Sequence, residues 1–481
     1  TNMLFSIAVT LLFLSFFASV ALTGFFRNFA KQKNLLIDIP NKSRKFHFRP
    51  TPLIGGLSIH LAMLLSSLFM FVLIDYKYDI KFSKFSETDL MQDLEISSPK
   101  YTQQLKIIDE GGEKVENIRV HVTPQNNSGL KSPLYDVQIG ASETNSLKIL
   151  QLDDDKFMVF LPNGQSSTFQ ATPSGIIELD PLGEALRKPI NIKTGSKNFF
   201  SFSTFTFAFI VIALALQIFT LIDDAYGMNA WKRLLAQSAA TLILIILGDV
   251  WITSLKLSIF NINLELGYLA IPFTVIAVTG VVNAFNMIDG INGLCAGLAL
   301  VALGALQIAS GFDVANYTLM IAMGSIIGFL FYNLGFLGNK RRVFLGDNGS
   351  TFLGFLVAWT CVNYSQPEME LINPVTCLWI IAVPLWDCLG VMIGRIINGI
   401  LPFSPGRDHI HHKLQEYTNS SNKTLFILIS SGLLLAATGI LIEQSSATSQ
   451  VSFLIFIAVS IAYYILSFIL SNINRTLPKN V

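Results

Sequence analysis

The stretch FSTFTFAFIVIALALQIFTLIDD, residues 202–224, decides the fold. Residues 202–222 carry no charge and are long enough to cross roughly 30 Å of hydrocarbon as one helix. The stretch then ends in two adjacent aspartates, Asp223 and Asp224. Because a charged side chain in the hydrocarbon costs about 2.5–3.5 kcal/mol on insertion scales, we expect both carboxylates at a membrane surface.

Similar apolar runs recur along the chain. Its 481 residues are 52% hydrophobic and only 14% charged, whereas a soluble domain carries about 25% charge. The runs lie near 3–24, 54–74, 202–222, 233–251, 266–284, 294–311, 317–336, 350–365, 374–394, 424–442 and 451–471. The sequence therefore predicts an all-α polytopic membrane protein of about eleven transmembrane helices. The net charge of +1 gives no indication of nucleic acid binding, and the four cysteines lie in apolar runs without metal-ligand spacing.

Basic residues concentrate in alternate connections. The connection after the first run holds seven of them between Arg27 and Arg49, and Lys232, Arg233 and 340–342 follow on the same side. The opposite connections are nearly free of lysine and arginine, apart from the long 75–200 segment. By the positive-inside rule, the basic side is cytoplasmic, which predicts an external N-terminus and an internal C-terminus.

Residues 75–200 are polar and separate 1–74 from 201–481. They hold 14 basic and 18 acidic residues, and a long segment translocates regardless of its charge. Alternating apolar and polar positions predict an extracytoplasmic β-rich domain, with one short helix over 87–94. The acidic run 153–155 is interpreted as a hairpin turn, with a Ca²⁺ site as the alternative. We expect this insert to bind a partner outside the cytoplasm or to form a homodimer.

Carboxylates at two helix ends are candidate catalytic or metal-binding groups. Asp223 and Asp224 repel each other, so a cation, a proton or a basic ligand between them would be favourable. Asp347 lies between Gly346 and Gly349 at the start of an apolar run. It can cap that helix or hold Mg²⁺ where phosphate oxygens also bind well.

Amides surround a third carboxylate at the end of the run near 266–284. The polar residues recur every three positions, at Asn283, Asn286, Asp289 and Asn292. Amides beside a carboxylate can contact a nucleobase or complete a magnesium shell. The alternative interpretation is a polar seam between helices.

Two basic segments complete the polar inventory of the cytoplasmic side. Arg44, Lys45 and His47 in the first loop can hold a lipid phosphate or anchor anionic head groups. The segment 404–412 carries Arg407, His409, His411 and His412 in a loop between two apolar runs. No thiolate accompanies the histidines, so phosphate binding fits them better than Zn²⁺.

All five sets of polar residues lie on one side of the predicted topology. Together they offer carboxylates for Mg²⁺, cations for phosphate oxygens and amides for a polar head group. Phosphoryl transfer requires a metal to neutralise charge and cations to clamp oxygens, so these residues indicate that chemistry.

The five motifs, in this order, resemble those of the polyprenyl-phosphate N-acetylhexosamine-1-phosphate transferase family. The resemblance covers the chain outside 75–200, and the form His409-Ile-His411-His412 is similar to the WecA-like branch. It implies a bacterial inner-membrane enzyme that transfers GlcNAc-1-phosphate from a UDP-N-acetylhexosamine to undecaprenyl phosphate, starting a lipid-linked glycan such as O-antigen. It also implies a cytoplasmic active site and a Mg²⁺ cofactor, for which Mn²⁺ can substitute.

The same resemblance implies residue roles. Asp347 would bind Mg²⁺, Asp223 would act as base or nucleophile-organising group, and Asp224 would support it or the metal. The set expected to contact the nucleotide sugar comprises Asn283, Asn286, Asp289, Asn292, Arg407, His409, His411 and His412, with Asp289 and His411 also as catalytic candidates. Arg44, Lys45 and His47 would hold the carrier phosphate. Asn292 departs from the aspartate more common in WecA-like enzymes.

Three alternatives have discriminating features. The same chemistry with another UDP-N-acetylhexosamine needs a substrate panel. A transporter would place its charges near the bilayer midplane, whereas the middles of these runs are almost free of charge. An inactive scaffold with an external binding domain would not need the carboxylates that the chain retains.

Overall fold

The chain divides into two compact units in the computed structural model. The first comprises residues 1–2 and 73–201, and the second comprises 3–72 and 202–481. The residues that the structure describes are 2–38, 49–82, 103–105, 118–125, 134–139, 146–151, 156–160, 166–172, 175–179, 204–259, 262–310, 317–366, 371–402, 404, 406–445 and 448–476. The loop residues Arg44, Lys45 and His47, the acidic run 153–155 and the expected helix 87–94 lie outside these ranges.

The first unit contains a seven-stranded antiparallel sheet. Each strand pairs with its neighbour in the sequence, in the order β3-β4-β5-β6-β7-β8-β9. The strands are β3 (Gln103–Leu105), β4 (Ile118–Gln125), β5 (Leu134–Ile139), β6 (Ser146–Gln151), β7 (Lys156–Phe160), β8 (Ser166–Thr172) and β9 (Gly175–Leu179). This order needs no crossover, since antiparallel strands that follow one another in the sequence can pair directly.

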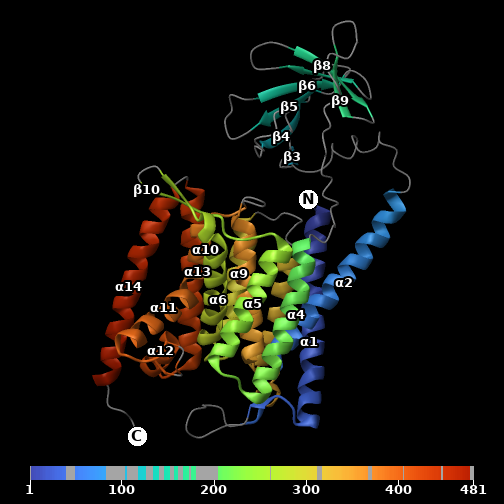
Figure 1. The fold of residues 1–481 in the computed structure, drawn as a ribbon. Coiled ribbons are helices and arrows are strands. Elements are labelled where there is room, and N and C mark those ends of the chain that lie inside the picture. Colours follow the sequence, from blue (N-terminus) through green and yellow to red (C-terminus); the bar gives the residue numbers. More distant parts are fainter. Residues whose placement is uncertain are drawn as a thin grey trace. The chain divides into compact units, whose positions relative to one another are not determined.

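The second unit is a helical bundle (Figure 1). Apart from Asn2 and residues 73–82 of α2, which belong to the first unit, it contains the helices α1 (Asn2–Lys33), α2 (Gly55–Phe82), α4 (Thr204–Tyr226), α5 (Ala230–Gly248), α6 (Ala270–Ile288), α7 (Leu294–Ala309), α8 (Tyr317–Asn333), α9 (Gly346–Ser365), α10 (Pro374–Ile380), α11 (Ala382–Ile397), α12 (Ile410–Thr418), α13 (Ser421–Gln444) and α14 (Ser449–Thr476). Between the helices lie two antiparallel strand pairs, β1 (Ile37–Asp38) with β2 (Thr51–Pro52) and β10 (Ser254–Ile259) with β11 (Ile262–Glu265). There are also two 3-10 turns, η2 (Gly267–Leu269) and η4 (Asn339–Arg341).

The bundle is that of a multi-pass membrane protein. In the described part of the chain, six helices are long and apolar enough to cross a membrane, or seven if α10 and α11 form one bent span. Residues 55–70 of α2, and α7 and α8, are shorter apolar helices. The number of eleven spans and their orientation stay predictions.

The apolar run 374–394 is not one straight helix, contrary to the sequence-based expectation. It divides at Ile381 into α10 and α11, which meet at a bend of 80°. Pro384 lies at the third position of α11, where it has no N–H to donate to the carbonyl of Ile380 and its ring opposes a continuous helix. The bend directs α11 and the segment after it differently from a straight span.

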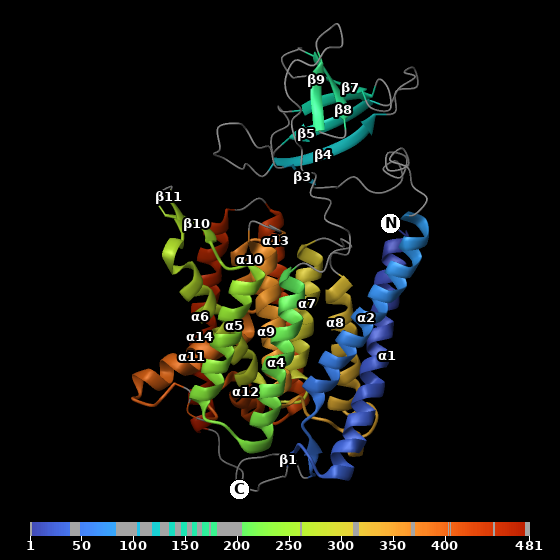
Figure 2. The ribbon, with the colours of Figure 1, turned by 45° about the vertical axis from the view of Figure 1, so that its right-hand side comes forward.

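Small residues bring α1 and α8 into close contact. Ser15, Ser19 and Thr23, spaced four residues apart on α1, are fully buried. The hydroxyl of Ser19 donates to the carbonyl of Ser325 on α8 over 2.6 Å. A Cβ on Gly328 would lie 2.6 Å from the carbonyl oxygen of Phe16, so only glycine permits this approach. Figure 2 shows α1, α2 and α8 side by side.

The start of α2 is held against the start of α9. Phe344 donates its N–H to the carbonyl of Pro52, and Gly55 donates to the carbonyl of Phe344 over 3.0 Å. Leu53 and Phe344 form an isolated parallel bridge. Backbone hydrogen bonds therefore join the segment before α2 to the segment before α9, although almost 300 residues separate them in the sequence.

Replacing Gly324 by alanine should destabilise the bundle. The added Cβ would meet the carbonyl of Leu12 and the hydroxyl of Ser15, and overpacking of this kind costs about 1–3 kcal/mol. The unfolding midpoint of the purified protein in detergent measures the effect. Gly280→Ala is the matched control, because nothing lies within 4 Å of its added Cβ. Equal midpoints for the two variants would contradict the α1–α8 packing described here.

Candidate functional site

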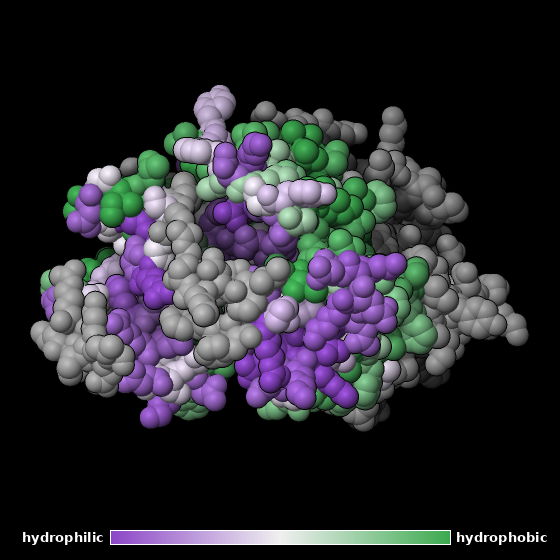
Figure 3. Space-filling model, turned by 90° about the horizontal axis from the view of Figure 1, so that it is seen from below, coloured by the Kyte–Doolittle hydropathy of each residue, from purple (hydrophilic) through white to green (hydrophobic). Residues whose placement is uncertain are grey.

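Five helix ends converge at one end of the bundle. There α4 and α6 finish, whereas α2, α5 and α9 begin, as the lower end of Figure 2 shows. Seen from below, hydrophilic side chains gather around a hollow in this face (Figure 3). The predicted site residues Asp223, Asp224, Asn286, Asp289 and Asp347 lie on or next to these helix ends.

Asp224 caps the first turn of α9. Its Oδ1 accepts the backbone N–H of Asp347 over 3.1 Å. Its Oδ2 accepts the backbone N–H of Asn348 over 3.2 Å and the side-chain amide of Asn348 over 2.6 Å. The first amides of a helix have no partner within the helix, and a carboxylate there also meets the positive end of the helix dipole. Asp224 of α4 therefore caps α9. Capping was one of the two roles that the sequence offered for Asp347.

Arg233 lies between the other two carboxylates. Its Nη1 donates to Asp347 Oδ2 over 2.6 Å, and its Nε lies 3.5 Å from Asp223 Oδ2. Asp223 is buried, and its Oδ1 accepts the backbone N–H of Met228. Its Oδ2 has no hydrogen-bond partner among the described residues. One guanidinium thus supplies the positive charge that the carboxylates require.

Glycines allow this close assembly. Gly346 has φ +78°, and a Cβ there would lie 3.0 Å from Asp224 Oδ2 and 2.8 Å from Asn348 Nδ2. A Cβ on Gly56 would collide with Asn348 Oδ1 and the backbone of Gly349. Substituting either glycine would therefore separate α2 or α4 from the start of α9.

Two predicted ligand-binding amides connect helices. Asn283 donates through Nδ2 to Gln237 Oε1 on α5 and to the carbonyl of Thr279, each over 2.8 Å. Asn286 donates to the hydroxyl of Ser350 on α9 over 2.9 Å. These contacts favour the alternative that the two amides form a polar seam between helices through their Nδ2 groups. Contact of either residue with a nucleotide stays a prediction.

Asp289 ends α6 beside the aspartate cluster. It occupies the C-cap position and is partly exposed, yet enough protein surrounds its carboxyl to disfavour the charge. Burial, followed by the negative charges of Asp347 and Asp224, raises the pKa of Asp289 to about 8. The half-buried Asn292 follows three residues later, in the turn before α7.

The histidine segment meets α6 at Gly290. A Cβ on that glycine would collide with His411 Nε2, so the imidazole lies directly against the backbone next to Asp289. His411 is 1% exposed, and its Nδ1 has no hydrogen-bond partner in the described part of the chain. Burial, then the charges of His412 and His409, lowers the pKa of His411 well below its usual value.

The expectation that all three histidines lie in a loop was wrong. His409 is the N-cap of α12, and His411 and His412 lie in its first turn. The buried Asp387 of α11 organises this start. Its Oδ2 lies 2.8 Å from His409 Nδ1, and its Oδ1 accepts the N–H of Ile410 over 2.7 Å. A carboxylate from a neighbouring helix again caps a first turn.

Arg395 holds the segment before α12. It is buried in the last turn of α11, donates through Nε to Asp408 over 2.8 Å and through Nη1 to the carbonyl of Pro402 over 2.9 Å. Burial would raise the pKa of Asp408, but the hydrogen bond and charge of Arg395 lower it. The neighbouring Arg407 contributes, after burial and His409, to a lowered pKa of His412.

Sequence reasoning missed four residues of this arrangement. Arg233 was counted only as a topology signal, Arg395 was given no place in a site, and Asn348 was passed over beside Asp347. Asp387 gave a usable signal, because a carboxylate inside an apolar run is rare without a function or partner. The predicted phosphate-binding Arg44, Lys45 and His47 lie outside the described residues, so the structure does not locate them.

The donor types fit a hard divalent cation. Asp223, Asp224 and Asp347 supply carboxylate oxygens, the ligands that Mg²⁺ prefers. Asp223 Oδ2 and Asn348 Oδ1 are buried without a hydrogen-bond partner among the described residues. In the described ranges, no three His, Cys, Asp or Glu side chains already surround one point as metal ligands. A metal would therefore require Asp347 to exchange Arg233 for the ion.

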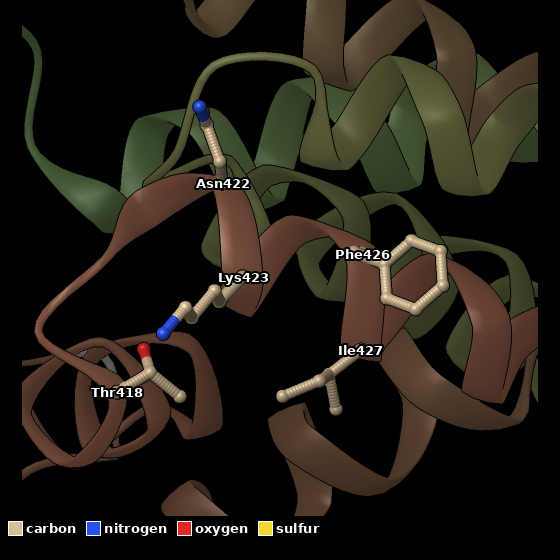
Figure 4. A pocket seen from close by; sticks show the side chains of 5 residues that line it. All are labelled: Thr418, Asn422, Lys423, Phe426 and Ile427. Carbon is tan, nitrogen blue, oxygen red and sulfur yellow. The ribbon is translucent and has the colours of Figure 1, made fainter.

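A separate cleft lies where α12 meets α13. Its volume is about 370 Å³, and it is lined by Thr418, Asn422, Lys423, Phe426 and Ile427. In Figure 4 the amine of Lys423 extends toward Thr418, whereas Phe426 and Asn422 point elsewhere. None of the five is a carboxylate or an imidazole, so the cleft lacks the chemistry of the aspartate cluster.

Comparisons with known proteins agree with the family resemblance over part of the chain. Residues 206–365 match the family model described as glycosyl transferase family 4. The undecaprenyl-phosphate alpha-N-acetylglucosaminyl 1-phosphate transferase of Escherichia coli (strain K12) is 36% identical over 228 residues, which cover 47% of this chain and 62% of that protein. The protein of the same name from Yersinia pestis is 34% identical over 226 residues, 46% of this chain and 62% of the relative. The chain thus matches somewhat under two thirds of these relatives' length.

Removing the carboxylate of Asp387 should destabilise α12. In Asp387→Ala, the buried His409 Nδ1 and the Ile410 N–H lose their partner, and each unsatisfied buried group costs about 1–3 kcal/mol. Limited proteolysis between α11 and α13 and the unfolding midpoint measure this loss. Asp387→Asn retains one acceptor and should lose less; an alanine variant as stable as wild type would refute the capping role.

The raised pKa of Asp289 should make stability depend on pH. Because the carboxyl in the unfolded chain titrates near pH ~4, the neutral form stabilises the fold fully below that pH. That contribution should be lost progressively as pH rises to about 8. The unfolding midpoint is measured between roughly pH 5 and 9 in the presence of a metal chelator. It should fall more steeply with pH for wild type than for Asp289→Asn, because the asparagine side chain stays neutral. Parallel curves would contradict the assignment.

Proposed function

We propose that this protein transfers N-acetylglucosamine-1-phosphate from UDP-N-acetylglucosamine to undecaprenyl phosphate. A phosphate oxygen of the carrier attacks the β-phosphorus of the nucleotide sugar, the bond between the two phosphates of that sugar breaks, and UMP leaves. The products are UMP and a lipid-linked pyrophosphoryl sugar. Direct attack suffices, because the carrier phosphate is itself a nucleophile.

One observation carries the proposal: Asp223, Asp224 and Asp347 meet at the end of the bundle, with Arg233 between two of them. Carboxylates of this kind suit a magnesium-bound pyrophosphate, and Arg233 suits its oxygens. The family model covers residues 206–365, which carry these residues, and the names of the relatives support undecaprenyl phosphate as acceptor and N-acetylglucosaminyl 1-phosphate as the transferred group. A transporter would instead need its polar groups near the middle of the spans.

The residues divide into roles by position. Asp347 and Asp223, with Asp224, would hold Mg²⁺, which when bound would neutralise charge on the phosphate oxygens. Asp289 borders the cluster and His411 lies against the adjacent Gly290, where both can contact the nucleotide sugar or move a proton. His409 and His412, on the same short helix, and Arg407 would bind its diphosphate.

The site lies at the basic end of the bundle. Arg27 and Lys31 from α1 reach the carbonyl of Lys340 at this end, and Lys232 and Arg233 begin α5 there. By the positive-inside rule we place this end in the cytoplasm and residues 75–200 outside. A partner for the external unit, a homodimer and the glycan pathway that is supplied stay predictions.

A radiolabelled transfer assay in membranes tests the proposal. Wild type with undecaprenyl phosphate should transfer label from UDP-N-acetylglucosamine in Mg²⁺, and chelation should abolish transfer. Asp347→Asn should lower kcat by about 100-fold or more, because it removes the charge expected to bind the metal. Asp249→Asn is the control, since Asp249 is exposed at the other end of α5.

The same assay with a panel of UDP-sugars separates the competing functions. Preferred transfer from another UDP-N-acetylhexosamine would keep the reaction and change the substrate. Absence of transfer from every UDP-sugar, with folded protein present, would refute the proposed activity. Near-normal activity of Asp347→Asn would refute the metal assignment alone.

A further inference from the structure

A polar pair lies buried among the apolar side chains of the bundle. His60 of α2 is 3% exposed and Gln217 of α4 is 2% exposed. His60 Nδ1 and Gln217 Oε1 are 2.6 Å apart, and because an amide oxygen can only accept, the imidazole donates. Placing two polar groups in such surroundings is costly, so the pair requires an explanation.

A third helix completes the contact. The imidazole of His60 stacks on Phe352 of α9, with ring centroids 4.2 Å apart and planes 13° from parallel. The stack fixes the ring, and the hydrogen bond to Gln217 fixes its rotation. The three residues therefore link α2, α4 and α9, the same helices that meet at Asp224.

The link lies one to two helical turns from the aspartate cluster. His60 is four residues from Gly56, and Phe352 is four residues from Asn348, which corresponds to about 6 Å along each helix. Gln217 is seven residues before Asp224, about 10 Å along α4. A shift of α4 relative to α9 at the level of Gln217 would thus move Asp224 away from the amides that it caps.

We propose that His60 and Gln217 are positioning residues that hold Asp224 against the first turn of α9. The catalytic part of this inference rests on the proposed transferase function. Stability alone explains the pair poorly, because well-packed apolar residues at such sites are often equally stabilising. Gln217 Nε2 also has no hydrogen-bond partner among the described residues, which is a cost that an apolar pair would avoid.

Backbone hydrogen exchange reports the positioning directly. The N–H groups of Asp347 and Asn348 donate to Asp224 and have no partner inside α9, so their protection depends on Asp224. The full-length protein in detergent is compared with His60→Phe, which retains the ring stack, with Gln217→Leu and with the double variant. Gln307→Leu, a buried glutamine near the opposite end of α7, is the matched control.

The expected results are specific. Each single variant should speed exchange of the 347–348 amides and lower kcat, both by about tenfold, with KM for the nucleotide sugar changed less than about twofold. The double variant should be no worse than the poorer single variant, because both remove one interaction. His60→Asn, which places a donor near the position of Nδ1, should restore both readouts, and Gln307→Leu should change neither.

Two outcomes would overturn the inference. One is wild-type exchange at 347–348 in folded His60→Phe and Gln217→Leu. The other is additive loss in the double variant without rescue by His60→Asn, which would indicate a general packing defect. If wild type transfers no sugar at all, the proposed function fails, whereas the exchange measurements still decide whether the pair positions Asp224.

Discussion

The cap that Asp224 places on α9 is the interaction on which the rest of the site depends. It joins residues 123 positions apart and satisfies amides that no residue of α9 can satisfy. With those amides capped by Asp224, the Asp347 side chain is left to face Arg233 rather than its own helix. The cap on one helix thus leaves Asp347 free to share a single cation, Arg233, with Asp223.

The same solution recurs at α12. Asp387 lies within α11 and caps a helix that begins 23 residues later, while it also fixes the imidazole of His409. Each cap comes from a carboxylate in a neighbouring helix, so the helix start cannot move without leaving its first N–H groups and that carboxylate unpaired. The imidazole of His411 lies at the end of α6, where Gly290 has no Cβ to keep it from the backbone.

The helices and the placement of the carboxylates could be predicted, because a membrane helix is recognised from the composition of its own segment. The run ending in Asp223 and Asp224 became α4, and the carboxylates predicted at surfaces did gather at one end of the bundle. Other features depended on contacts that no local pattern contains. The contact of Arg233 with two carboxylates and the capping role of Asp387 were not predicted. The run 374–394 was expected to be one continuous span, but it divides close to Pro384.

The sequence by itself determined the helical membrane fold, the motifs and their chemistry, because hydrophobic length and the types of polar side chain are local properties. The tertiary structure alone decided which carboxylate caps a helix, which faces an arginine and which has its pKa raised by burial and by neighbouring carboxylates. Those outcomes depend on distances between residues up to 123 positions apart, and a hydrogen bond or a charge interaction changes steeply with such distances.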